Sequence, residues 1–115
     1  MSTWVILAAV AVAIVIVPRL LGGRRVSSNV VLEKIKAGAK IIDVRTPGEF
    51  RGGAYPNAIN IPLQVLSGRL HEIPRDRPVV LYCASGLRSG SAVRVLRQAG
   101  YADVVNAGGL GSMPR

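Results

Sequence analysis

One stretch constrains the fold more than any other, because it indicates a buried strand, a tight turn and an amphipathic helix in direct succession. Residues 78–82 form an apolar run, and small or apolar side chains then recur at helical spacing over 90–99. The turn between them holds Cys83, the only cysteine of the chain. Together with the other strand and helix patterns, this unit predicts an α/β domain with a mostly parallel central sheet flanked by helices.

The position of Cys83 predicts a reactive thiol. A cysteine that follows a buried strand is most often an inert, small apolar residue. Here the start of a helix offers unpaired N–H groups and a positive dipole, and Arg88 adds a full positive charge. Gly86 permits the positive φ that turns backbone N–H groups inward. These features favour the thiolate, which is the nucleophilic form of cysteine.

Two charged side chains lie at the end of another predicted strand. Asp43 and Arg45 follow the apolar start of residues 39–44, and Pro47 then begins a turn of helix. Charges at the carboxyl end of a parallel strand usually face the crevice in which α/β sheets hold their sites. The alternative is that Asp43 and Arg45 simply pair with each other and cap the turn.

The remaining elements follow from apolar spacing and from glycine and proline signals. Ser27 or Ser28 is expected to cap the first helix, and Gly38 to end it. The expected elements are a helix over 28–37, strands over 39–44 and 58–61, a helix over 62–73 and a strand over 101–105. His71 lies in the helix over 62–73 and is expected on the surface, which excludes a Cys–His pair.

The N-terminal end of the chain predicts a membrane anchor. Residues 4–17 are all apolar, and the low-polarity segment continues to Leu21, about 20 residues or roughly 30 Å as a helix. A cleavable signal peptide needs a basic start and a small-x-small cleavage site, and neither is present. We therefore expect an anchor over 1–21, a flexible Gly/Arg linker over 22–26 and a domain over 27–115. The arginines after the anchor predict a single-pass membrane protein with that domain on the cytoplasmic side.

The net charge of the chain indicates which classes of binding partner to expect. Fifteen lysines and arginines against six acids give a net charge of +9, which favours an anionic substrate or a membrane surface. Nucleic acid is not expected, because the basic residues are scattered and no nucleic-acid-binding motif occurs. A single cysteine excludes an internal disulfide and a resolving cysteine. We predict neither a metal site nor a cofactor.

Three segments together resemble the rhodanese (thiosulfate sulfurtransferase) family. They are the loop from Cys83 to Ser89, the Asp-Val-Arg and Pro-x-Glu-Phe motifs over 43–50, and residues 54–63, which resemble Gly-His-x-Pro-x-Ala-x-Asn-Ile-Pro. Residues 106–111 also resemble the Asn-x-Gly-Gly turn of the family. The resemblance covers nearly all of 28–111. Ala54 is a departure, because a histidine is common at that position.

This resemblance implies a small rhodanese-like fold and a sulfurtransferase. Cys83 would carry sulfane sulfur as a persulfide from thiosulfate or a similar anionic donor to cyanide or a thiol, a protein thiol included. Arg88 would bind the oxygens of the donor, Asp43 would brace the loop or Arg88, and Arg45 would steer anions. The expected loop residues that bind substrate and persulfide are Ala84, Ser85, Gly86, Leu87, Arg88 and Ser89.

Two alternatives to this function are considered. Dual-specificity phosphatases of the cell cycle and related arsenate reductases share the fold but place five residues between cysteine and arginine. Here four intervene, and Tyr82 replaces the histidine before the cysteine, which favours sulfur over phosphate chemistry. The second alternative is a membrane-tethered persulfide carrier or interaction module with little turnover of its own.

Overall fold

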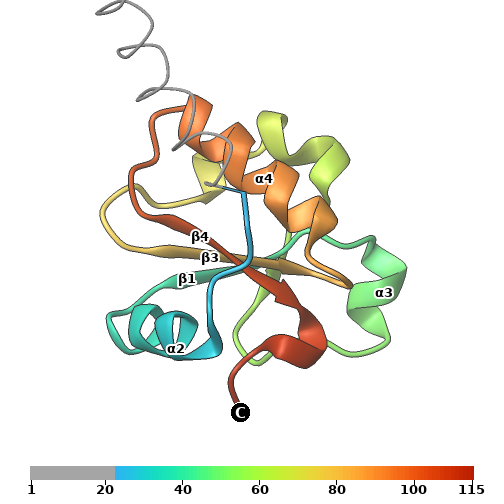
Figure 1. The fold of residues 1–115 in the computed structure, drawn as a ribbon. Helices are drawn as coiled ribbons and strands as arrows, with labels where there is room; N and C mark the ends of the chain where they lie inside the picture. Colours follow the sequence, from blue (N-terminus) through green and yellow to red (C-terminus); the bar gives the residue numbers. More distant parts are fainter. Residues whose placement is uncertain (1–22) are drawn as a thin grey trace, which may run out of the picture.

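The computed structural model describes residues 23–115, and they form an α/β fold built on a parallel sheet (Figure 1). The predicted membrane anchor over 1–21 lies outside the described residues. Between residues 23 and 115, none of the helices is both long and apolar enough to span a bilayer. The strands run in the order β2 (Ile59–Asn60), β1 (Lys40–Asp43), β3 (Val79–Cys83), β4 (Val104–Gly109). The predicted α/β class with a parallel central sheet is thereby confirmed.

Helices cover both faces of this sheet. Figure 1 shows α4 on one face and α2 on the other, with α3 beside the carboxyl ends of the strands. As predicted, Ser27 caps the first helix, since its side chain accepts a hydrogen bond from the N–H of Val30. The helical elements are α2 (Ser28–Lys36), α3 (Pro47–Arg51), α4 (Leu87–Gln98) and the 3-10 turns η1 (Leu63–Gly68), η2 (Leu70–Glu72) and η3 (Leu110–Ser112).

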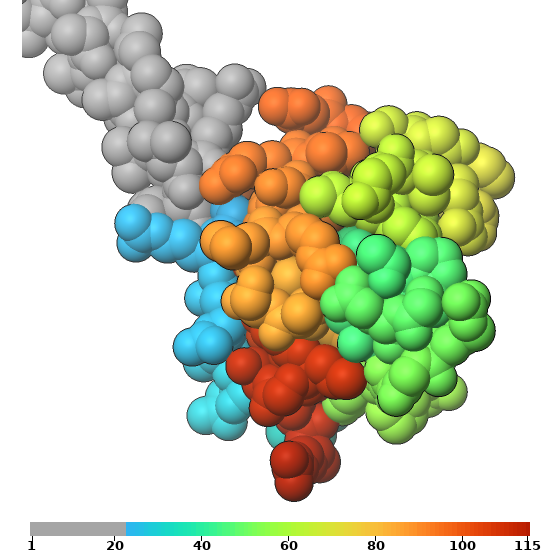
Figure 2. Space-filling model, turned by 90° about the vertical axis from the view of Figure 1, so that its right-hand side faces the viewer, coloured from blue at the N-terminus to red at the C-terminus, as the bar shows by residue number. Residues whose placement is uncertain are grey.

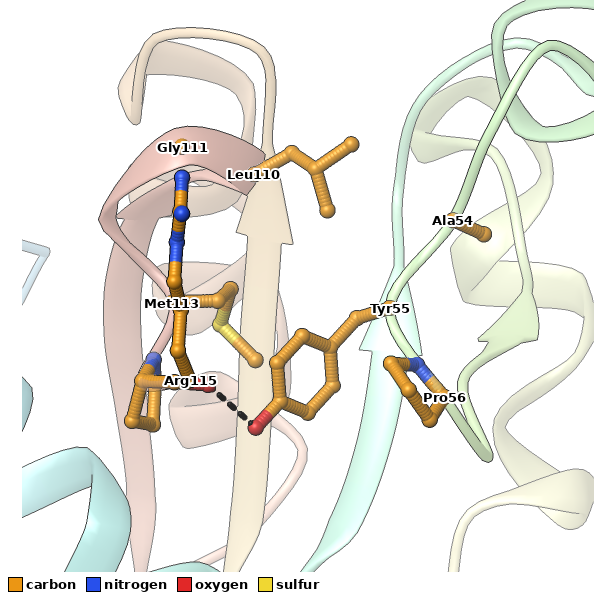
Figure 3. Close-up of a pocket in the computed structure, with 8 residues that line it drawn as sticks. Ala54, Tyr55, Pro56, Leu110, Gly111, Met113 and Arg115 are labelled. Atoms are coloured by element: carbon orange, nitrogen blue, oxygen red, sulfur yellow. Dashed lines mark hydrogen bonds between the residues drawn. The ribbon is translucent and has the colours of Figure 1, made fainter.

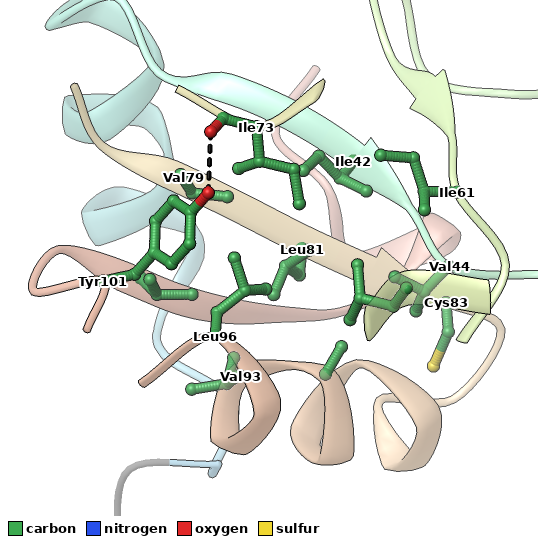
Figure 4. Packing of buried hydrophobic residues seen from close by; sticks show 13 residues of the cluster. Ile42, Val44, Ile61, Ile73, Val79, Leu81, Cys83, Val93, Leu96 and Tyr101 are labelled. Atoms are coloured by element: carbon green, nitrogen blue, oxygen red, sulfur yellow. Dashed lines mark hydrogen bonds between the residues drawn. The ribbon is translucent and has the colours of Figure 1, made fainter. Parts of the chain in front are cut away.

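Successive side chains of β3 point to opposite faces of the sheet, so the core has two layers. Leu81 and Cys83 pack towards α4 and η1, and Figure 4 shows this layer of side chains above the helix. Val80 and Tyr82 pack into the second layer, which contains Val31 of α2. All five residues of β3 are buried, as expected for a central parallel strand covered on both faces.

The helix predicted over 62–73 is wrong, because the chain forms two separate 3-10 turns there. Arg69 lies between them with φ −124° and ψ 19°, outside the helical region, directly after Gly68. Leu66 of the first turn is fully buried in the core. The side chain of His71 is 77% exposed, which confirms its predicted position on the surface.

The last strand begins three residues later than predicted and includes residues 106–109 of the segment expected to be a turn. Tyr101 does not join the sheet, because its buried ring is held by hydrogen bonds from its hydroxyl to the carbonyls of Leu70 (3.0 Å) and Ile73 (2.7 Å). Strand β4 instead pairs Asn106 with Leu81 and, after an irregularity, Gly109 with Cys83. This register places Asn106 beside the cysteine loop.

The segment expected to be a flexible linker packs on the edge of the sheet over residues 23–26. Arg25 forms an isolated parallel bridge with Asn106, and the N–H of Val26 donates to the Asn106 carbonyl at 2.9 Å. Gly23 is buried against α4, where a Cβ on Gly90 would lie 2.7 Å from the Gly23 carbonyl oxygen. The exposed backbone groups of the β4 edge explain this docking.

Candidate active site

The candidate site lies at the carboxyl edge of the sheet. Strands β1 and β3 are neighbours in parallel register and end in Asp43 and Cys83, respectively. Helices α3 and α4 both begin at this edge, so their N–H groups and first-turn side chains surround the ends of the strands. This is the edge at which open α/β sheets place their sites.

The loop folds around the sulfur of Cys83. The Sγ atom accepts hydrogen bonds from the N–H of Gly86 at 2.9 Å and from the Ser89 hydroxyl at 3.3 Å. Gly86 caps α4 in the left-handed region with φ 98°, and a Cβ there would also lie 3.2 Å from the Cα of Gly108. A glycine is therefore required twice at this position, for the turn and for the close approach.

Two opposing effects set the pKa of Cys83. Burial raises the pKa, because the thiolate loses its hydration. Hydrogen bonds from the Ser89 hydroxyl and from the backbone N–H groups of Ser89, Ser85 and Gly86 outweigh burial and hold the pKa of Cys83 below its ordinary value of 9.0. The cysteine is thus prepared as a nucleophile by neutral donors.

Arg88, expected to bind the oxygens of the donor, forms an ion pair with Glu49 of α3, and its charge also interacts with Cys83. The guanidinium donates to both carboxylate oxygens, at 2.7 and 3.0 Å. Arg88 first, and then the backbone N–H of Thr46, lower the pKa of Glu49 from 4.5 to about 2. The sequence motif contained Glu49, but its partner, 39 residues away, was not foreseen.

Asp43 and Arg45 pair with each other, which was the alternative considered for them. Two guanidinium nitrogens of Arg45 lie 2.7–3.0 Å from the Asp43 carboxylate oxygens, and one also donates to the Gly53 carbonyl at 2.6 Å. Both residues are buried, at 0% and 7% exposure. Among residues 23–115 no hydrogen bond or ion pair joins Asp43 to Arg88, and these two charges interact only at longer range. The ion-paired Arg45 fixes the chain between β1 and α3.

Asn106 is a residue of the site that the sequence did not reveal. Its Oδ1 lies 2.7 Å from the Ser89 hydroxyl oxygen and shares that hydroxyl's single proton with the Cys83 sulfur, and it also accepts from the Gly108 N–H at 2.9 Å. Its Nδ2 donates to the carbonyls of Gly86 at 2.9 Å and Gly23 at 2.8 Å. The side chain is 2% exposed and all four of its hydrogen-bonding positions are used. It therefore fixes both donors of the Cys83 sulfur.

Ala54 is the position at which the chain departs from the motif that it otherwise resembles. It lines a pocket of about 330 Å³ between residues 54–56 and the C-terminal residues (Figure 3). There the Tyr55 hydroxyl donates to the Pro114 carbonyl at 2.6 Å. No residue of the 83–89 loop lines this pocket.

Replacing Ser89 with alanine is expected to make Cys83 less reactive. Loss of a hydrogen bond to a charged group, about 1.5–3 kcal/mol, slows alkylation by iodoacetamide at pH 7 by about tenfold or more. Ser91→Ala is the matched control, because that hydroxyl bonds the Leu87 carbonyl at 3.4 Å and not the sulfur. Equal alkylation rates in the two variants would contradict the assigned role of Ser89.

Glu49→Gln is expected to change how stability depends on pH. Since the folded-state pKa of Glu49 is lowered to about 2 from 4.5, its stabilisation is present above about pH 4.5 and is lost as the pH falls to about 2. The variant should melt at a lower temperature than the wild type at pH 7. Its melting temperature should also fall less than that of the wild type when the pH is lowered. Glu33→Gln, at an exposed glutamate of α2, is the control. Parallel melting curves for wild type and Glu49→Gln across this range would refute the assignment.

Comparisons with known proteins agree with this geometry. The Rhodanese-like domain family matches residues 27–111. The chain is 45% identical over 69 residues to "Sulfurtransferase" of Allochromatium vinosum, which covers 60% of this chain and 64% of that protein. It is 41% identical over 71 residues to "Thiosulfate sulfurtransferase PspE" of Escherichia coli, which covers 60% of this chain and 68% of that protein.

Solved structures show the same fold. A "rhodanese with anions from E. coli" matches with a TM-score of 0.62 at 38% identity, and the match covers 66% of this chain and 94% of that protein's chain. The human single-domain sulfurtransferase TSTD1 matches with a TM-score of 0.67 at 26% identity, and the match covers 74% of this chain and 88% of that protein's chain. With its sulfurtransferase relatives and its family match over residues 27–111, the chain belongs to the Rhodanese-like domain family.

Proposed function

We propose that the chain transfers sulfane sulfur from thiosulfate, or a similar anionic donor, to a thiophilic acceptor through a persulfide on Cys83. The observation that carries this proposal is the convergence of the Gly86 N–H and the Ser89 hydroxyl on one sulfur atom. These donors favour an anion at this position, first the thiolate and then the anionic persulfide.

In the first half-reaction the Cys83 thiolate attacks the outer sulfur of the donor. A new S–S bond forms to Cys83, and the S–S bond of thiosulfate breaks with its electron pair leaving on sulfite. Attacking and leaving groups are both anions, so no side chain has to supply or remove a proton. The exposed His71 has no part in this step.

In the second half-reaction the acceptor attacks the outer sulfur of the persulfide. The S–S bond to Cys83 breaks, and the Cys83 thiolate is regenerated in the same set of hydrogen bonds. The Glu49–Arg88 pair joins α3 to the first turn of α4, next to the loop. Its role in the reaction is to position the loop.

One observation favours the second candidate, a persulfide carrier with little turnover. The Cys83 residue is 0% exposed, so a small donor or acceptor reaches the sulfur only if loop atoms move. A protected persulfide that waits for a specific protein acceptor suits such a site. Loading and turnover must therefore be measured separately.

Thiosulfate is expected to load one sulfur atom onto Cys83. The full chain, purified in detergent, is incubated with thiosulfate, and its intact mass is measured before cyanide is added and thiocyanate followed. A gain of one sulfur that cyanide discharges over many cycles supports the sulfurtransferase, whereas loading without turnover favours the carrier. Cys83→Ser should neither load nor turn over. A folded wild-type chain that loads no sulfur would exclude both functions.

The proposal includes a membrane tether, supported by the apolar run over 4–17 and the arginines that follow it. The chain is expected to remain in the membrane fraction after alkaline extraction. In sealed vesicles, protease should digest the domain only when the cytoplasmic face is outward. Release by alkali, or digestion from the opposite face, would contradict the predicted single-pass topology.

A further inference from the structure

A basic groove lies beside the loop that holds Cys83. It has a volume of about 530 Å³ and is open along one side. One wall is the N-terminal segment with Arg24 and Arg25, and the other is the loop and the first turns of α4 up to Arg94. Figure 2 shows this face, with the N-terminal segment in blue beside the orange of α4.

The charge of this groove is not neutralised by any acid of the chain. None of the six aspartates and glutamates, all within residues 23–115, lines the groove. Arg45 and Arg88, the other arginines of the site edge, each pair with a carboxylate. Arg24, Arg25 and Arg94 have no ion pair among residues 23–115, so the positive potential next to the loop comes from them.

The groove is continuous with the exposed crest of the loop. Ser85, Gly86 and Leu87 line it, and the Leu87 side chain is 81% exposed. Cys83 itself does not line the groove. A ligand that occupies the groove and also meets the sulfur must therefore cross the loop, which requires something larger than thiosulfate.

We infer that this groove docks the acceptor, a protein that presents a thiol beside an acidic surface. The inference rests on the sulfur transfer proposed above and names its acceptor class. Arg24, Arg25 and Arg94 contact the acidic side chains of the partner, and Leu87 supplies an apolar contact at the loop. Complementary charge speeds such an encounter, most of all at low salt.

A membrane surface fits the same groove less well. Phospholipid head groups are also anionic, and Arg24 and Arg25 follow the predicted anchor closely in the sequence. A bilayer pressed against the groove would cover Ser85 and Leu87, and with them the loop that donor and acceptor must reach. A protein acceptor has to contact that loop in any case.

The transfer step itself needs no further reagent. The thiolate of the acceptor attacks the outer sulfur of the Cys83 persulfide, and the S–S bond to Cys83 breaks. Cys83 leaves as a thiolate and the acceptor becomes the persulfide. Neither an oxidant nor a reductant is consumed.

The test compares two thiol peptides as acceptors for the loaded full chain in zwitterionic vesicles. One peptide carries glutamates around its cysteine, and the other carries glutamines at the same positions. At low salt the acidic peptide should discharge the persulfide about tenfold faster or more, and high salt should remove the difference. The preference for the acidic peptide should disappear in the triple variant Arg24→Gln, Arg25→Gln and Arg94→Gln. It should remain when the same three arginines are changed to lysine. Equal rates for both peptides with the wild-type chain would overturn the inference.

Three controls separate the alternatives. The triple variant Lys36→Gln, Arg51→Gln and Arg77→Gln removes the same charge at exposed residues outside the groove, and loss of preference there would overturn the inference. Loss of preference in anionic vesicles would also overturn it, because lipid head groups would then fill the groove. Binding of the S-methylated acidic peptide, measured by fluorescence anisotropy, tests the groove independently of sulfur transfer. If thiosulfate loads no sulfur but this peptide still binds, only the proposed function fails.

Discussion

The structure of the site depends on hydrogen bonds that converge on one sulfur atom. A buried thiolate is unstable unless donors replace its lost hydration, and here the Gly86 N–H and the Ser89 hydroxyl do so. These donors are placed by the left-handed Gly86 and by Asn106, which binds the carbonyl of one and the hydroxyl of the other. Since Asn106 also binds the Gly23 carbonyl, the N-terminal segment and the loop share one polar network.

The charged side chains of the site form ion pairs, and the hydrogen bonds to the sulfur come from neutral donors. Asp43 with Arg45, and Glu49 with Arg88, form two ion pairs at the carboxyl edge of the sheet. The first fixes the chain after β1, and the second joins α3 to α4. Arg24, Arg25 and Arg94, which have no ion pair among residues 23–115, line the neighbouring groove. This division separates the chemistry at Cys83 from the recognition of an anionic partner.

The sequence predicted what depends on neighbouring residues and missed what depends on register. The strand, turn and helix around Cys83 follow from local periodicity, so their order and the role of Gly86 could be predicted. Glu49 and Arg88 lie 39 residues apart, and they meet only because parallel strands bring the starts of α3 and α4 to the same edge of the sheet. Asn106 was expected in a turn, because nothing local shows that β4 pairs it with Leu81. The helix over 62–73 failed because apolar spacing does not distinguish an α-helix from short 3-10 turns.

The most direct test is the pKa of Cys83 in the folded chain. It is measured from the ultraviolet absorbance of the thiolate as the pH is raised, with the Cys83→Ser chain subtracted to remove the tyrosines. Convergent hydrogen bonds predict a midpoint below the ordinary cysteine value of 9.0, and a return towards it in denaturant. A midpoint at or above that value in the folded chain would show that burial wins over the loop donors, and would contradict the account.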